Sequence, residues 1–137
     1  PAADLATRAG TRLLTIRARL AAGGAPAALL KHEGDQSSHD FLMAALAEHR
    51  PGDAVMSEEG TAHAVHPDRS GAERTWIVDP VDGTREYSEP PRSDWAVHVA
   101  LVEAGRPTAG AVALPALDLT LSTVGPPAAA GLAPIHI

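Results

Sequence analysis

The chain has 137 residues, which suits one modest domain, and 45% of them are hydrophobic, which is enough for a real core. It contains no cysteine, which excludes a disulfide framework, thiol catalysis and thiolate metal sites. The formal net charge of −6 and the lack of a basic run argue against binding of nucleic-acid polymers. No apolar run reaches the length of a membrane span and the start does not resemble a signal peptide, so a cytoplasmic location is expected.

Two helices are predicted at the start of the chain. Apolar residues recur at steps of three and four within residues 3–22, and Gly-Gly-Ala-Pro at residues 23–26 ends that helix. Residues 27–37 are predicted to be a loop or short extended piece, because they run into the polar cluster at residues 34–38. A second helix is predicted from about residue 37 to residue 49. The predicted core-facing residues are Ala6, Ala9, Leu13, Ile16 and Leu20 in the first helix and Phe41, Leu42, Ala45 and Leu46 in the second.

Five short strands are predicted after the helices. They cover residues 54–56, 75–78, 95–102, 108–114 and 119–123, and residues 60–73 are predicted to be a surface loop. Two helices followed by strands predict an α+β fold, with the helices packed on one side of a largely antiparallel sheet. We expect this domain to cover residues 1–124 and residues 125–137 to be a linker and the start of a further domain. The chain is therefore expected to be a fragment of a longer protein.

Acidic residues follow two of the predicted strands. Glu58 and Glu59 come after the strand at 54–56, and the motif Asp79-Pro80-Val81-Asp82-Gly83-Thr84 comes after the strand at 75–78. Carboxylates at strand ends are held rigidly yet stay open to solvent, and magnesium prefers such oxygen ligands. Asp79, Asp82, the Val81 carbonyl and Glu58 therefore predict a magnesium site.

The residues after the second aspartate indicate phosphate chemistry. Gly83 lets the backbone approach a ligand closely, and a helix that begins near Thr84 would offer its N–H groups to an anion. Two magnesium ions about 3.5–4 Å apart can clamp a phosphoryl group and lower the pKa of a water molecule. The chain has no Walker A loop and no nucleophilic Ser or Cys motif, which favours an activated water over a covalent intermediate.

These features also have ordinary structural explanations. Asp-Pro and Asp-Gly pairs are common in turns, and a Glu-Glu pair is usually a solvated face. Trp76 and Trp95 are predicted to be core anchors, and His98 a packed or edge residue of a strand. Arg85 and Arg92 follow the motif, where they either meet a second phosphate or remain solvated.

Together the acidic residues resemble the inositol monophosphatase superfamily of lithium-sensitive phosphatases. The shared pattern is an early Asp, then Glu-Glu, then Asp-Pro-hydrophobic-Asp-Gly-Thr, and this chain has Asp35, residues 57–59 and residues 76–84 in that order. The run Thr84-Arg85-Glu86-Tyr87, followed by residues 93–101, is most similar to the CysQ branch of 3′(2′),5′-bisphosphate nucleotidases. The resemblance covers roughly residues 5–124 and implies the N-terminal part of a layered α/β/α/β sugar-phosphatase-like fold.

The resemblance implies metal-binding roles for the acids. Glu58, Asp79 and the Val81 carbonyl would bind one magnesium ion, and Asp79 and Asp82 would bind a second. Glu58 and Thr84 would position the attacking water, and Asp82 would also contact the substrate phosphate. A late Trp-Asp motif of the family is absent here, so the second of two or three magnesium sites would be incomplete. We therefore expect this chain alone to bind metal weakly and to lack full turnover.

Further roles follow from the same resemblance. Asp35 would accept a hydrogen bond from Thr84, and the Gly83 and Thr84 backbone N–H groups would hold phosphate oxygens. Glu59 would sit beside the site, and Arg85 is a candidate for substrate contact.

The implied activity is magnesium-dependent hydrolysis of a phosphomonoester. For the CysQ branch, the substrate would be 3′-phosphoadenosine 5′-phosphate, or its sulfate, with AMP or its sulfate as product, a reaction of sulfur assimilation. Inositol-1-phosphate and fructose-1,6-bisphosphate stay open as substrates within the same superfamily. The expected partner is a small phosphorylated metabolite rather than a nucleic acid or a membrane, and the resemblance allows a homodimer.

The acidic motif has three other interpretations. Haloacid dehalogenase phosphatases need Asp-x-Asp-Gly-Thr, but two residues separate Asp79 from Asp82 here, and a Glu-Glu pair has no role in that chemistry. An EF-hand needs acids at alternate positions and a distant Glu, which this spacing does not provide. A non-catalytic domain that keeps the acids as a metal-dependent latch stays open.

Overall fold

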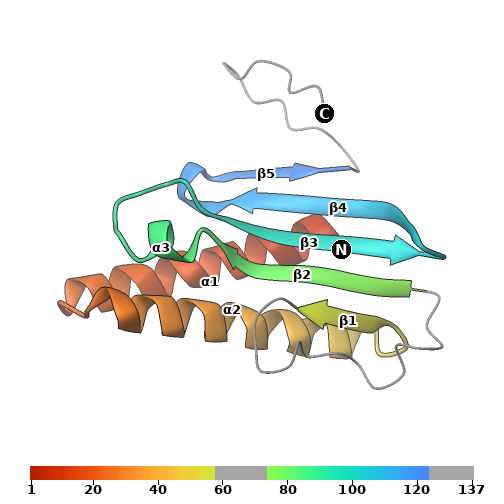
Figure 1. Ribbon diagram of the computed structural model, residues 1–137, viewed down its shortest axis with the longest axis horizontal. Coiled ribbons are helices and arrows are strands. Elements are labelled where there is room, and N and C mark those ends of the chain that lie inside the picture. The colour runs from red at the N-terminus through yellow and green to blue at the C-terminus, as the bar shows by residue number, and fades with distance from the viewer. Residues whose placement is uncertain (58–73, 124–137) are drawn as a thin grey trace, which may run out of the picture.

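The computed structural model describes residues 1–57 and 74–123. Its elements, in chain order, are α1 (Ala2–Ala22), α2 (Ala27–His49), β1 (Ala54–Ser57), β2 (Arg74–Asp82), α3 (Thr84–Tyr87), β3 (Ala96–Glu103), β4 (Arg106–Leu114), the 3-10 helix η2 (Pro115–Leu117) and β5 (Leu119–Ser122). The strands form one sheet in the order β1-β2-β3-β4-β5, with β1 parallel to β2 and every later pair antiparallel (Figure 1). The predicted α+β fold with a largely antiparallel sheet is confirmed.

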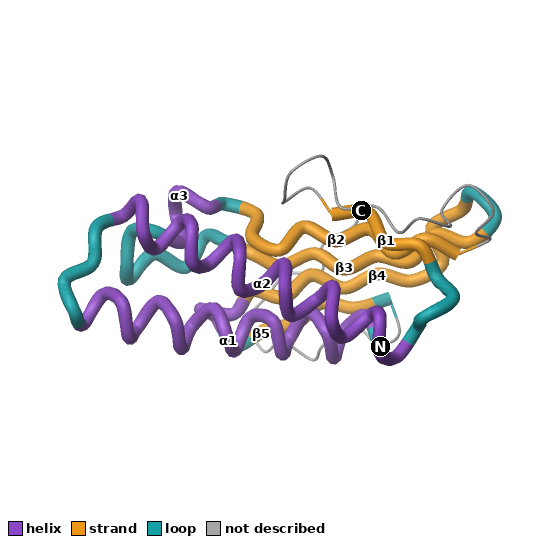
Figure 2. Tube along the Cα trace, turned by 90° about the horizontal axis from the view of Figure 1, so that it is seen from below, coloured by secondary structure: helices purple, strands orange, loops and turns teal. Residues whose placement is uncertain are grey.

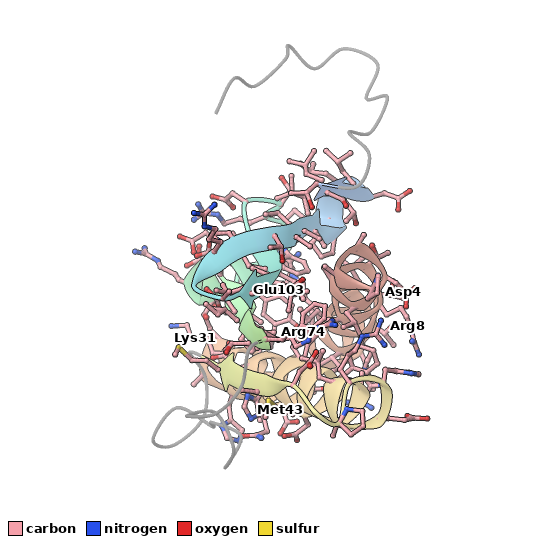
Figure 3. The ribbon with its side chains drawn as sticks, turned by 90° about the vertical axis from the view of Figure 1, so that its right-hand side faces the viewer. Asp4, Arg8, Lys31, Met43, Arg74 and Glu103 are labelled. Atoms are coloured by element: carbon pink, nitrogen blue, oxygen red, sulfur yellow. The ribbon has the colours of Figure 1, made fainter. Side chains whose placement is uncertain are left out.

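Both long helices cover one face of this sheet (Figure 2, Figure 3). α1 packs on β3, β4 and β5, while α2 packs on β1 and β2. The largest core side chains are Trp76, Trp95 and Tyr87, and small or branched aliphatic residues fill the rest. Each fully buried Leu or Val contributes about 1.5–3 kcal/mol. On the far side of α1, Asp4 and Arg8 form an exposed ion pair of 3.6 Å (Figure 3).

The main correction to the sequence prediction concerns α2. Residues 27–37, predicted as a loop, form the first half of this helix, which starts directly after Pro26. The polar cluster at residues 34–38 lies inside the helix, where Gly34 and Ser38 are buried one turn apart. The residues that look like helix breakers in the sequence are therefore on the packed side of a continuous helix.

Contacts with the end of β2 and with α3 explain why these two positions are small or polar. A Cβ atom added to Gly34 would lie 2.4 Å from Cε1 of Tyr87, so only glycine lets that ring approach. The Ser38 hydroxyl donates a buried hydrogen bond of 2.8 Å to the carbonyl oxygen of Pro80. The polar cluster thus reflects where the helix touches the acidic motif, and propensity is overridden by tertiary contacts.

The remaining predicted helices and strands are confirmed with small changes of boundary. β2 is longer than predicted, because it continues through the acidic motif to Asp82. The acidic pair Glu58-Glu59, the loop at 60–73 and the segment 125–137 lie outside the described residues. Within the described ranges, no helix is both long and apolar enough to cross a membrane.

Candidate metal and phosphate site

The motif that carries both aspartates forms a β-bulge at the end of β2. Asp79 pairs with His98 of β3 whereas Asp82 pairs with Ala96, so three steps on β2 match two steps on β3. Residues three apart on a regular strand face opposite sides of a sheet, but one extra residue brings them to the same side. The bulge therefore directs both aspartates to one face, opposite to the fully buried Val78.

His98 contacts one of the two aspartates and stands opposite the other. Its Nε2 lies 3.0 Å from Oδ2 of Asp82, and it stands directly opposite Asp79 in the β2–β3 register. Side chains of directly opposite residues project from the same face of a sheet. His98 was predicted to be a packed or edge residue of a strand. It is neither, because β3 is an interior strand and the imidazole is 41% exposed.

The bulge is held in place by its two apolar residues. Pro80 and Val81 are both buried, at under 2% and 3% exposed. Proline has no N–H to contribute to a strand ladder, so a bulge is one of the few places where it fits within a sheet. Its carbonyl oxygen accepts the Ser38 hydrogen bond described above, so α2 fixes the bulge from the core side.

A glycine turn connects the bulge to α3, as the ribbon in Figure 1 shows. Gly83 has φ of 84°, a left-handed conformation that glycine adopts without steric cost. A Cβ atom there would also lie 3.0 Å from the carbonyl oxygen of Asp94 and 3.3 Å from Cα of Trp95. The predicted helix start near Thr84 is confirmed, although α3 is only four residues long.

The Thr84 hydroxyl connects this turn to α2. It lies 3.2 Å from Oδ1 of Asp35 and 3.3 Å from the carbonyl oxygen of Val81. The predicted hydrogen bond between Thr84 and Asp35 is confirmed. A hydroxyl has one proton to donate. When that proton goes to Asp35, the Val81 carbonyl is available to a cation.

A buried aromatic cluster anchors α3 to α1. The Tyr87 hydroxyl donates to the Leu13 carbonyl at 2.8 Å, and its ring packs edge-on against Trp95 with centroids 4.9 Å apart. The Arg17 guanidinium lies 5.7 Å from the centre of the Tyr87 ring and 5.6 Å from that of Trp95. Burial raises the pKa of Tyr87 to about 12 and lowers the pKa of Arg17.

The sequence patterns do not predict that Arg17 and Tyr87 are buried. The helical stripe predicted Ile16 and Leu20, which are only partly buried, whereas Arg17 is 6% exposed. Within the described residues, Nε and Nη2 of Arg17 have no hydrogen-bond partner. Periodicity alone predicts that a charged residue next to an apolar stripe is exposed to solvent. The burial of Arg17 depends instead on its cation–π contacts with Tyr87 and Trp95.

The two arginines after the motif differ in their availability. Arg92 donates to Glu89 at 3.1 Å and to Asp94 through two nitrogens, which raises the pKa of Arg92 and lowers the pKa of both carboxyl groups. Arg85 is 76% exposed and has only a loose contact of 3.5 Å with Glu89. Of the two, Arg85 has the side chain that a ligand can recruit.

The oxygen atoms of the bulge fit a hard cation. Asp79, Val81 and Asp82 offer two carboxylates and one carbonyl from a single turn, and magnesium completes its octahedron with water. Within residues 1–57 and 74–123, no three or more His, Asp or Glu side chains converge on one point. Glu58, the third predicted carboxylate, and Glu59 lie outside the described residues. The described residues therefore include Asp79, Val81 and Asp82 of the predicted ligand set, but not its glutamate.

Comparisons with known proteins place the chain in a family. Residues 5–126 match the inositol monophosphatase family, so the chain belongs to that family and the resemblance is confirmed. It is 45% identical over 127 residues to a 3′-phosphoadenosine 5′-phosphate phosphatase of Mycobacterium leprae (strain TN). It is 35% identical over 86 residues to the 3′(2′),5′-bisphosphate nucleotidase CysQ of Salmonella typhimurium (strain LT2). These matches cover 93% and 62% of this chain.

The fold also matches solved structures. Inositol monophosphatase II of Staphylococcus aureus MSSA476 superposes with a TM-score of 0.73 at 26% sequence identity and covers 90% of this chain. The predicted fold class is confirmed by this match. The chain spans 44% and 33% of the two curated relatives and 45% of the solved structure, which is less than half of each.

Proposed function

We propose that this chain is the metal-binding part of a phosphomonoesterase that hydrolyses a small phosphorylated metabolite with an activated water. The observation that carries the proposal is the bulge in β2, which directs Asp79 and Asp82 to one face next to the hydrogen bond between Thr84 and Asp35. Family membership supports this reaction class, because the two curated relatives are named as a phosphatase and a nucleotidase.

Magnesium would be held by the two bulge aspartates and the Val81 carbonyl, with Glu58 as a further ligand. β1 ends at Ser57, whose partner on the parallel strand β2 is Val78, the residue before Asp79. This register supports Glu58, the next residue along, as a ligand. When bound, magnesium lowers the pKa of a coordinated water and screens the charge of the phosphate.

Thr84 would orient the attacking water. Because its hydroxyl donates its single proton to Asp35, the oxygen is left with lone pairs that accept a hydrogen bond from a water molecule. As the water attacks phosphorus, its proton would pass to Oγ1 of Thr84 while the Thr84 proton passes to Oδ1 of Asp35. Glu58 is the second proposed contact of this water.

The turn after the bulge would hold the phosphate. The Gly83 and Thr84 N–H groups and Asp82 would meet the phosphate at the start of α3, and the left-handed Gly83 supports a close approach of backbone to ligand. Asp82 would serve phosphate binding as a magnesium ligand, because a carboxylate repels a phosphate that approaches it directly.

The substrate that we propose is 3′-phosphoadenosine 5′-phosphate or its sulfate. The name of the Mycobacterium leprae relative supports this choice. Arg85 supports it too, because an exposed guanidinium beside the phosphate turn suits a second phosphate. Inositol-1-phosphate is the alternative, which the likeness to the Staphylococcus aureus inositol monophosphatase II favours.

The test is release of inorganic phosphate by the complete protein that contains this chain. Equal concentrations of 3′-phosphoadenosine 5′-phosphate, inositol-1-phosphate and fructose-1,6-bisphosphate would be compared with and without magnesium. We expect magnesium-dependent turnover with the adenosine bisphosphate preferred. Asp79→Asn should abolish it, whereas Asp4→Asn, a change in an exposed ion pair on α1, should leave it unchanged.

Each alternative predicts a different experimental result. Full activity of Asp79→Asn contradicts the proposal. An acyl-phosphate trapped on Asp79 would favour the covalent dehalogenase chemistry. Preference for inositol-1-phosphate would keep the reaction class and change the substrate. Magnesium binding without turnover of any phosphomonoester would favour a non-catalytic domain.

A further inference from the structure

His98 lies beside the two proposed metal ligands of the bulge. It lies on the interior strand β3, where Asp79 is its register partner, and its Nε2 is 3.0 Å from Oδ2 of Asp82. Within the described residues, no other side chain forms a hydrogen bond with Asp82. The proposed reaction as described above gives this histidine no role.

The described neighbours of His98 on β3 and β4 have apolar side chains. Along β3, the residues on the same face are Ala96 and Ala100, and the partner on β4 is Val112. None of these three side chains can donate a hydrogen bond. Among these described neighbours on β3 and β4, the imidazole is therefore the one side chain that can donate a hydrogen bond to the bulge.

The chemistry of the pair fixes the direction of the hydrogen bond. An ionised carboxylate can only accept, so Nε2 of His98 carries the proton that Oδ2 of Asp82 receives. One oxygen of the carboxylate is then occupied, and Oδ1 is the oxygen left for a cation. Magnesium keeps near-octahedral geometry, which a carboxylate bound through one oxygen accommodates well.

We propose that His98 is a positioning residue, which holds Asp82 so that Oδ1 faces the magnesium ion. The inference rests on the proposed function, because it assumes that the bulge holds a metal. His98 acts through Asp82 and not as a ligand, because its Nε2 carries the proton that Oδ2 of Asp82 accepts. Groups that hydrogen-bond a metal ligand typically change metal affinity by about 10–100-fold when they are removed.

The main alternative is that His98 only stabilises the fold. The exposure of the His98 and Asp82 side chains distinguishes this alternative from positioning. The side chains of His98 and Asp82 are 41% and 61% exposed, and such surface pairs contribute little to stability. Removal of the imidazole should therefore leave the melting temperature nearly unchanged. A change in metal affinity at constant stability is what positioning predicts.

The experiment measures Mn²⁺ binding to the complete protein by electron paramagnetic resonance, with Mg²⁺ competition to confirm that both ions share the site. We expect His98→Ala to weaken Mn²⁺ binding by about tenfold or more. His98→Gln should restore affinity to within about threefold, because its side-chain amide nitrogen can take the place of Nε2. His98→Asn should not restore it, because its amide is one bond shorter. His49→Ala, at the exposed C-terminal end of α2, is the control and should bind as the wild type does.

The outcomes separate this inference from the proposed function. If Asp79→Asn loses Mn²⁺ while His98→Ala binds it as tightly as wild type, the role of His98 is refuted and the metal site stands. If Gln and Ala at position 98 weaken binding equally and both lower the melting temperature, His98 is a structural residue and the inference is also refuted. If the wild type and Asp79→Asn bind Mn²⁺ equally, the proposed metal site itself fails, and the inference fails with it.

Discussion

The two long helices lie side by side on the same face of the sheet, yet they bury different kinds of residue (Figure 2). α1 keeps one apolar stripe, and most of its buried positions are Ala or Leu. The first half of α2 buries Gly34 and Ser38 instead and carries Asp35 between them. The difference lies in what each helix touches: α1 packs mainly on β3 and β4, whereas α2 meets β2 and the turn that follows it.

This contrast shows that a helix beside the proposed site gives up some apolar burial for specific contacts. A helix that mainly covers a sheet, as α1 does apart from its contacts with Tyr87, can optimise apolar burial over most of its length. A helix that must support a bulge and a phosphate turn needs a small residue for close approach and polar side chains for specific hydrogen bonds, at the expense of helix propensity. The predictions below test this division between the two helices, beginning with the largest expected effect.

Two glycines, one in each helix, give the sharpest comparison. A Cβ atom at Gly34 would meet the Tyr87 ring at 2.4 Å, and one at Gly10 of α1 would meet Cγ of Pro115 at 2.5 Å. Each change to Ala should lower the free energy of unfolding by about 1–3 kcal/mol through overpacking. Only Gly34→Ala should also weaken metal binding, because Tyr87 is the last residue of α3, which directly follows the bulge and Gly83. Urea unfolding and Mn²⁺ titration of both variants measure this, and an equal loss of affinity in Gly10→Ala would contradict the division.

Ser38→Ala should have the next largest effect. It leaves the buried carbonyl oxygen of Pro80 without its α2 donor, which costs about 1–2 kcal/mol. Because that carbonyl belongs to the bulge, metal affinity should fall as well. Ser37→Ala, one residue earlier and only partly buried, is the matched control for urea unfolding and Mn²⁺ titration. Unchanged affinity in Ser38→Ala would mean that the bulge keeps its shape without α2.

Tyr87→Phe tests the anchor between α3 and α1. Loss of the hydrogen bond to the Leu13 carbonyl should cost about 1 kcal/mol at neutral pH. Because burial raises the pKa of Tyr87 to about 12 from an ordinary 10.0, the neutral phenol contributes stability that is complete below pH 10 and is lost as pH rises toward 12. Melting temperatures measured between pH 8 and 12 should fall less steeply for Tyr87→Phe than for the wild type, and the difference should arise above about pH 10. Parallel curves would contradict the assignment of the alkaline transition to Tyr87.

Arg85→Ala should have the smallest effect. The side chain is 76% exposed, so stability should change by less than about 0.5 kcal/mol. The KM for 3′-phosphoadenosine 5′-phosphate should rise roughly two- to fivefold, as for an exposed ion pair, with little change for a substrate that has one phosphate. Arg92→Ala is the comparison, because Arg92 is already occupied by Glu89 and Asp94. A larger KM effect for Arg92→Ala would reverse the assignment.

Much of the fold could be predicted from the sequence because its patterns are local. The stripe of α1 and the alternation of β3 and β4 follow from helix and strand periods, and these elements were predicted to within a few residues. The Asp-Pro-Val-Asp-Gly-Thr motif and the contact between Asp35 and Thr84 could also be predicted, through family resemblance.

What could not be predicted depends on contacts between distant segments. Gly34 and Ser38 look like helix breakers until Tyr87 and Pro80 are placed against them. The bulge cannot be recognised from the spacing of the two aspartates, because it is defined by a register against β3. The pairing of His98 with Asp82 follows from the same register. Glu58 and Glu59 stay predictions, since they lie outside the described residues.

The central claim is that the bulge of β2 brings two aspartates to one cation. The most direct test is a crystal structure of the complete protein grown with Mn²⁺, with anomalous scattering recorded at the metal edge. We expect an anomalous peak about 2 Å from a carboxylate oxygen of Asp79 and from one of Asp82, at the distance of a directly bound hard cation. A bound ion that touches neither aspartate, or that touches only one while the other points to the opposite face of the sheet, would contradict the account.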